Sequence, residues 1–207
     1  MVDSKNIDLV FKYIDSLFPD AKCELFYRED YELVIAVMLS AQTSDKAVNK
    51  VSKSLFLKYD SLDSLAQAEL IDIEHEIQEI GLYKNKAKNI KGIAQTLIND
   101  FHYVVPSDKT DLQKLPGIGN KSAGVIRCEI FQIPDLPVDT HIIRISKRLG
   151  IAKASDKPID IERKLKKLIK EDCWIKSHHQ LIHFGRYFCT ARNPKCEQCK
   201  IRKYCKN

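Results

Sequence analysis

Four of the seven cysteines lie within the last nineteen residues of this 207-residue chain. They follow the pattern Cys-x6-Cys-x2-Cys-x5-Cys, and they are Cys189, Cys196, Cys199 and Cys205. Four thiolates in so short a span can surround one metal centre, either a zinc ion or a 4Fe–4S cluster. Zinc sites more often combine two Cys-x2-Cys pairs, and only one such pair is present here, so the spacing favours iron–sulfur. Arg192 and Lys195 lie between the first two cysteines, as solvated loop charges or as phosphate contacts.

A tight turn, Pro116-Gly117-Ile118-Gly119, separates two apolar segments with helical spacing. Gly117 and Gly119 permit backbone conformations and close approaches that a side chain would block. Backbone N–H groups in such a turn, followed by the start of a helix, form a site for an anion such as phosphate. Taken alone, a glycine-rich stretch between two helices is also simply a turn.

A lysine and an aspartate stand at the predicted starts of two successive helices. Lys121 follows Asn120, where the helix dipole disfavours a positive charge and so favours the neutral amine that forms Schiff bases. Asp139 follows the proline-bounded loop 133–138 and is a favoured N-cap residue. A carboxylate held in that way can take up a proton or stabilise a developing cation. A solvent-facing lysine and a purely structural cap explain the same two residues.

Three histidines near the C-terminus, His178, His179 and His183, include one pair with i,i+4 spacing. We assign them no metal, because the four cysteines already complete a site and no carboxylate accompanies the histidines. The charged run 162–167 is interpreted as the solvated face of an amphipathic helix, with Leu165 and Leu168 facing inward.

The composition fits a globular protein with a polyanionic partner. Charged residues make up 30% of the chain, hydrophobic residues 44%, and the formal net charge is +6. A basic balance of this kind is typical of, but not specific to, proteins that bind nucleic acid. No apolar run reaches the roughly 18 residues that a membrane span needs, so we expect a cytosolic location.

Apolar residues recur with helical spacing along the whole chain, and no segment alternates with the period of a strand. The prediction is an all-α fold of about ten short helices. Asp3 or Ser4 can cap the first helix and Pro19 ends it, while Gly81 is expected to terminate the helix over 70–79 as a C′ glycine. The remaining helices are predicted over 31–39, from Asp45 to about Tyr59, over 62–67, 84–100, two segments either side of the glycine turn, 140–149, 158–170 and 173–188.

In this order the motifs resemble the endonuclease III family, part of the helix-hairpin-helix DNA glycosylase superfamily. The likeness covers residues from about 30 to 205. It includes Leu39-Ser40-Ala41-Gln42-Thr43-Ser44-Asp45 and Ile80-Gly81-Leu82-Tyr83, which look like two further family segments. Ser122 replaces the threonine that often follows the family's lysine. Gly124 lies inside the next helix, which it weakens by roughly 0.5–1 kcal/mol relative to alanine.

The resemblance implies two all-α domains with a DNA cleft between them. Residues 22–132 would form a six-helix barrel that includes the helix-hairpin-helix at about 108–131. Residues 1–21 and 133–207 would form the iron–sulfur cluster domain, whose cluster loop is 189–205. The four cysteines would hold a 4Fe–4S cluster, which we expect to have a structural role.

The resemblance also assigns roles to single residues. Lys121 would be the nucleophile and Asp139 the essential carboxylate. Gln42 and Leu82 match residues that fill the gap, or wedge the strand, when a nucleotide is extruded. The complete set expected to contact DNA is Gln42, Leu82, Gly117, Gly119, His141, Arg192 and Lys195.

The implied function is base excision repair: a DNA glycosylase with abasic-site lyase activity that removes oxidised pyrimidines. Its partner would be duplex DNA containing damaged pyrimidines or abasic sites, with the protein acting as a monomer in the nucleoid. Two alternatives are a mismatch thymine or uracil glycosylase of the same superfamily, and a catalytically silent DNA-binding iron–sulfur protein. Sequence-independent phosphate contacts would make binding weaken steeply with salt.

Overall fold

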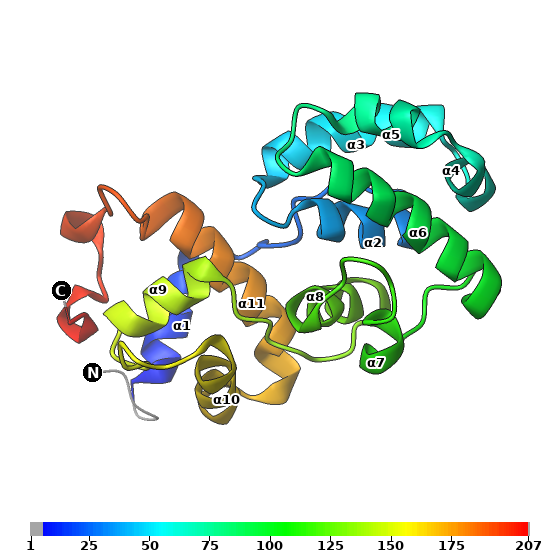
Figure 1. Ribbon diagram of the computed structural model, residues 1–207. Coiled ribbons are helices and arrows are strands. Elements are labelled where there is room, and N and C mark those ends of the chain that lie inside the picture. Colours follow the sequence, from blue (N-terminus) through cyan, green and yellow to red (C-terminus); the bar gives the residue numbers. More distant parts are fainter. Residues whose placement is uncertain (1–5, 207) are drawn as a thin grey trace. The chain divides into compact units, whose positions relative to one another are not determined.

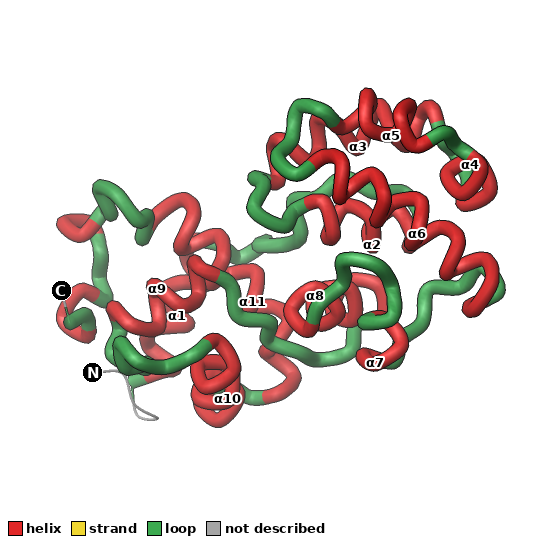
Figure 2. Tube along the Cα trace, viewed as in Figure 1, coloured by secondary structure: helices red, strands yellow, loops and turns green. Residues whose placement is uncertain are grey.

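The structure, a computed structural model, describes residues 6–206. Within that range the chain forms helices joined by loops and contains no strand (Figures 1 and 2). The predicted all-α fold is therefore confirmed. The proposed first-helix caps, Asp3 and Ser4, lie outside the described residues. None of the helices within residues 6–206 has the length and apolar character needed to cross a membrane.

The chain divides into two compact units. One unit is the continuous segment Glu24–Phe131. The other combines Met1–Cys23 with Gln132–Asn207, so the first helix belongs with the C-terminal part of the chain. We call them the hairpin unit and the cysteine unit after the motifs that they contain, and we describe each separately.

The hairpin unit is built around α2, which is buried along almost its whole length. Each residue from Glu32 to Leu39 is buried, which explains the continuous apolar run in the sequence. Helix α6 packs against α2, α4 and α5, and α8 packs against α2. The helices of this unit are α2 (Asp30–Leu39), α3 (Asp45–Lys58), α4 (Leu62–Gln67), α5 (Leu70–Ile77), α6 (Tyr83–Phe101), α7 (Lys109–Leu112) and α8 (Asn120–Phe131).

Local chemistry sets most helix boundaries in this unit. Ser44 caps α3 by accepting a hydrogen bond from the Ala47 N–H, and Asp108 caps α7 in the same way. The expectation for Gly81 was wrong. Helix α5 ends at Ile77, and the residue with a left-handed backbone is Leu82, with φ 60°. The left-handed turn thus leads into α6 and does not terminate α5.

The cysteine unit packs its helices around a second apolar core. Its helices are α1 (Ile7–Leu17), α9 (Thr140–Arg148), α10 (Pro158–Leu168) and α11 (Trp174–His183). The core includes Val10, Ile14, Ile142, Leu165 and Phe184. The helix predicted over 173–188 is less regular than expected, because a 3-10 turn precedes α11 and a π-helical turn, Phe184–Phe188, follows it.

An ion-pair network holds the loop that precedes α9. Asp135 lies in this loop, is 3% exposed and accepts a hydrogen bond from the Leu136 N–H. Lys166 on α10 donates to both Asp135 and Glu162, and its ammonium also lies 5.0 Å from the centre of the Trp174 ring. Burial alone would lower the pKa of Lys166, but the two carboxylates outweigh it and raise that pKa. The ammonium therefore stays charged, and the network intact, at neutral pH.

We predict that Lys166→Met destabilises the fold by roughly 2–4 kcal/mol, because it removes one partner of the buried Asp135–Lys166 ion pair. Urea unfolding measures the effect. Lys167→Met, at an exposed position of the same helix, is the matched control and should change the free energy of unfolding only slightly. An equal loss of unfolding free energy in the two variants would contradict a structural role for the network.

Candidate active site and metal centre

The glycine turn between α7 and α8 requires a glycine at one of its two positions. Gly117 has φ +79°, and a Cβ there would lie 2.6 Å from Asn89 Nδ2 and 2.9 Å from Met38 Cγ. Gly119 differs, because a Cβ placed on it would meet nothing within 4 Å. The first glycine thus permits the turn and its packing, whereas the second leaves the backbone open to an approaching group.

Lys121 lies in the first turn of α8 and is exposed. The Ala123 N–H donates to the Gly119 carbonyl at 2.9 Å, which begins the hydrogen-bonding ladder of this helix. Helix geometry leaves the preceding N–H groups for partners outside the helix, and the dipole favours an anion there. The start of α8 can therefore bind a phosphate close in sequence to the Lys121 amine.

Asp139 is the N-cap of α9, as the sequence predicts. Its carboxylate accepts a hydrogen bond from the Ile142 N–H at 2.9 Å, which fixes its orientation. His141 follows, with its Nδ1 3.3 Å from the Arg144 guanidinium. Burial lowers the pKa of His141, and the nearby Asp139 carboxylate only partly opposes this shift. A neutral imidazole can accept a hydrogen bond from Arg144.

Gln42 and Leu82 both have left-handed backbones, with φ of 56° and 60°. Such a conformation costs a residue with a side chain roughly 1–2 kcal/mol. Both side chains are nevertheless exposed, and 59% of Leu82 is accessible to solvent. The Gln42 turn thus exposes an amide, and the Leu82 turn exposes a large apolar side chain. Strained turns that expose side chains in this way are typical of sites that contact another molecule.

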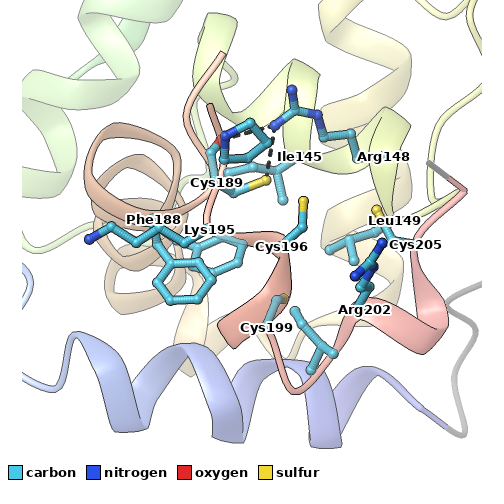
Figure 3. Close-up of a pocket in the computed structure, with 13 residues that line it drawn as sticks. Ile145, Arg148, Leu149, Phe188, Cys189, Lys195, Cys196, Cys199, Arg202 and Cys205 are labelled. Atoms are coloured by element: carbon cyan, nitrogen blue, oxygen red, sulfur yellow. Dashed lines mark hydrogen bonds between the residues drawn. The ribbon is translucent and has the colours of Figure 1, made fainter. Parts of the chain in front are cut away.

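The four C-terminal cysteines line one cavity in the cysteine unit (Figure 3). Its apolar lining comes from Ile145, Leu149, Phe184, Phe188 and Ile201, and Arg148, Lys195 and Arg202 also line it. Within residues 6–206, no three His, Cys, Asp or Glu side chains converge tightly enough for one metal ion. The thiols instead border a shared space. Four thiol donors around an apolar cavity are the ligand set of an iron–sulfur cluster.

The cysteine loop is bound to α9 by two arginines that the sequence analysis did not single out. Arg144 and Arg148 both donate to the carbonyl of Cys189, and Arg148 Nη1 also lies 3.2 Å from Cys189 Sγ. The i,i+4 spacing of the two arginines indicated one shared face of the helix. A hydrogen bond to a thiolate sulfur stabilises its negative charge, as a cluster ligand requires.

The middle of the loop is held by α1. The Tyr13 hydroxyl donates to the Gln198 carbonyl at 3.2 Å, and its ring packs edge-to-face on Phe188. Burial raises the pKa of the Cys199 thiol, and the neighbouring cysteines raise it further. The positive charge of bound iron would reverse that effect and favour the thiolate that ligation needs.

The cations between the first two cysteines face solvent. Arg192 and Lys195 are both exposed, and the Lys195 ammonium lies 6.0 Å from the centre of the Phe188 ring. Among the predicted site residues, the structure thus gathers the four cysteines with Lys195 at one cavity. Gly117, Gly119 and Lys121 share the start of α8 in the hairpin unit, while Asp139 and His141 share the start of α9 in the cysteine unit.

Comparison with known proteins defines the family. Residues 35–171 match the HhH-GPD superfamily of base excision DNA repair proteins, and residues 189–205 match the iron–sulfur binding domain of endonuclease III. Endonuclease III of Bacillus subtilis is 41% identical over the whole of this chain and 94% of its own length. The Rickettsia felis enzyme is 40% identical over 96% and 93%.

Solved structures agree with the sequence comparison. A trapped endonuclease III–DNA covalent intermediate superposes with a TM-score of 0.96 at 42% identity, covering 100% of this chain and 97% of that one. The chain therefore belongs to the HhH-GPD superfamily of base excision DNA repair proteins and, within it, to the endonuclease III family. Its cofactor is the 4Fe–4S cluster of that family, which decides against zinc.

We predict that alanine affects stability at one glycine of the turn and DNA binding at the other. Gly117→Ala should lower the free energy of unfolding by roughly 2–4 kcal/mol, through backbone strain and the clash with Asn89. Gly119→Ala should change it by less than about 1 kcal/mol. The added methyl should nevertheless weaken binding of an abasic-analogue duplex by roughly tenfold, because it blocks a phosphate. Unchanged affinity in Gly119→Ala would contradict the phosphate site.

We also predict that Cys199→Ser loses the absorbance at about 400 nm that iron–sulfur charge transfer gives, together with most soluble protein. Cys173→Ser is the matched control, since Cys173 is exposed and does not line the cavity. Absorbance and iron content per chain report the result. Zinc without iron in the wild-type protein would refute the cluster.

Proposed function

We propose that this protein removes oxidised pyrimidines from duplex DNA and then nicks the strand at the resulting abasic site. The observation that carries the proposal is the glycine turn with Lys121 at the start of α8. It stands in a chain 42% identical, over its full length, to an endonuclease III trapped on DNA as a covalent intermediate.

The chemistry begins with the amine of Lys121. Its nitrogen forms a bond to C1′ of the extruded nucleotide, and the bond from C1′ to the base breaks, with its electron pair leaving on the base. The base takes up a proton, and opening of the sugar converts the new bond into a Schiff base. Asp139, held at the start of α9, stabilises the cationic charge that develops at C1′ and accepts a proton from the lysine.

Strand cleavage follows from the Schiff base. Its electron-withdrawing carbon acidifies the neighbouring C2′, so loss of a C2′ proton expels the 3′ phosphate by β-elimination. Water then hydrolyses the Schiff base and restores the Lys121 amine. The bond to the base and the bond to the 3′ phosphate are thus both broken in this sequence, and one lysine takes part in both events.

The protein must also open the duplex. Extrusion of a nucleotide leaves a gap in the stack, and damaged bases cost least to extrude. Gln42 and Leu82 are exposed and can fill this gap or wedge the strand, while backbone N–H groups beside Gly119, at the start of α8, donate to a phosphate. His141, Arg192 and Lys195 add further contacts to the phosphate backbone of the DNA. The protein acts as a monomer on nucleoid DNA.

Borohydride trapping tests the assignment. Reduction with borohydride should link wild-type protein covalently to a thymine-glycol duplex, and Lys121→Gln should form no adduct, because an amide cannot make a Schiff base. Lys167→Gln, which removes an exposed lysine of α10, is the matched control and should trap like wild type.

Three outcomes would contradict parts of the proposal. An adduct in Lys121→Gln would refute the nucleophile. Release of thymine from a G·T pair with none from thymine glycol would instead indicate a mismatch glycosylase. Failure of the wild-type protein to nick an abasic duplex in a single turnover would indicate a silent DNA-binding protein.

A further inference from the structure

A buried lysine of the hairpin unit lies close to the two strained turns that carry Gln42 and Leu82. Lys86 is in the first turns of α6, is only 4% exposed, and occupies the same helix face as the core residue Ile90. Burial lowers its pKa. A lysine ammonium is costly to bury unless its hydrogen bonds are satisfied, so its partners indicate what it stabilises.

Two groups in and beside the loop between α2 and α3 accept hydrogen bonds from Lys86. Its Nζ donates to the Leu39 carbonyl at 2.9 Å and to the Thr43 hydroxyl at 2.6 Å. Leu39 is the last residue of α2, so its carbonyl is one that the helix itself leaves without a partner. Figure 1 shows the start of α6 beside this loop.

The same loop carries Gln42 between the residues that this network fixes. The Thr43 hydroxyl, which accepts from Lys86, donates in turn to the Ala41 carbonyl at 3.3 Å. The Thr43 N–H donates to the Ser40 carbonyl at 3.2 Å. Hydrogen bonds therefore fix both neighbours of Gln42, Ala41 and Thr43, and so stabilise the left-handed backbone of Gln42.

The backbone of Lys86 secures the second strained turn. Its N–H donates to the Leu82 carbonyl at 3.0 Å, which forms the first helical hydrogen bond of α6. One residue thus bonds through its backbone to the Leu82 turn and through its side chain to the Gln42 loop. Each turn is strained at the residue that it displays, so each needs such support.

We propose that Lys86 is a positioning residue that holds the Gln42 loop and the Leu82 turn in a fixed relation, so that both side chains enter the DNA stack together when a nucleotide leaves it. The inference rests on the proposed function, because it takes from it the roles of Gln42 and Leu82. Lys86 itself contacts no DNA in this account. It acts by keeping two inserting residues preorganised, which saves the entropy of ordering them during extrusion.

The structure provides a matched control on the same helix. Lys91 also donates to a backbone carbonyl, that of Ala68 at 2.8 Å, but this contact anchors the end of α4 and neither strained turn. Lys86→Met and Lys91→Met both remove a lysine–carbonyl bond from α6. A merely structural role for Lys86 predicts that the two variants behave alike.

The test compares single-turnover cleavage of two duplexes that contain thymine glycol. In one the lesion is paired with adenine, and in the other it lies in an unpaired bubble, where little extrusion is needed. Lys86→Met should slow cleavage of the paired duplex by roughly ten- to a hundredfold, the effect of leaving a buried acceptor unsatisfied. It should change the bubble rate by no more than about twofold, and Lys91→Met should affect both rates equally.

Two further variants keep the inference falsifiable if Lys86→Met folds poorly. Thr43→Val preserves volume but removes the bridging hydroxyl, and it should reproduce the selective loss on the paired duplex. In a Gln42→Ala, Leu82→Ala background, Lys86→Met should cause no further selective loss, because the residues that it positions are gone. Additive losses there, or equal losses on both duplexes, would overturn the inference.

The design separates this inference from the proposed function. Wild-type protein that cleaves the paired duplex, with Lys86→Met indistinguishable from Lys91→Met, would overturn the role of Lys86 alone. Wild-type protein that cleaves neither duplex would overturn the proposed function, and the role of Lys86 with it.

Discussion

An α-helix leaves its first backbone N–H groups without partners inside the helix, and the proposed chemistry of the protein depends on this constraint. At the start of α8 these groups stand beside Gly119, where a side chain is absent, and can bind a phosphate. At the start of α9, Asp139 occupies the same kind of position and is oriented by the Ile142 N–H. The proposed nucleophile and the fixed carboxylate thus both lie at helix starts and not in a buried polar pocket.

The cysteine loop depends on α9 in a different way. It contributes few apolar side chains of its own, and the hydrogen bonds of Arg144 and Arg148 to Cys189 join it to the helix that Asp139 caps. The π-helical turn that precedes the loop also packs closely on α9, because a Cβ on Gly185 would lie 2.8 Å from the His141 Cβ. The cluster therefore has a direct structural connection to α9, consistent with a stabilising role for the metal centre.

Sequence patterns predicted the features that depend on neighbouring residues. The Asp139 cap and the helix expected over 31–39, which corresponds to α2, both follow from local chemistry. Gly81 was misjudged because α5 already ends at Ile77, and the left-handed residue is the neighbouring Leu82, the N-cap of α6. The contacts of Lys86 with Leu39 and Thr43 span more than forty residues, so spacing could place Lys86 on the buried face but could not name its partners.

The central claim is that Lys121 forms the covalent bond to DNA, and locating that bond in the chain tests it most directly. Wild-type protein should be reduced with borohydride on an abasic duplex, digested with protease and nuclease, and mapped by tandem mass spectrometry. The account predicts one modified peptide, with the reduced deoxyribose remnant on Nζ of Lys121. The same remnant on another lysine, or on the N-terminal amine, would contradict it.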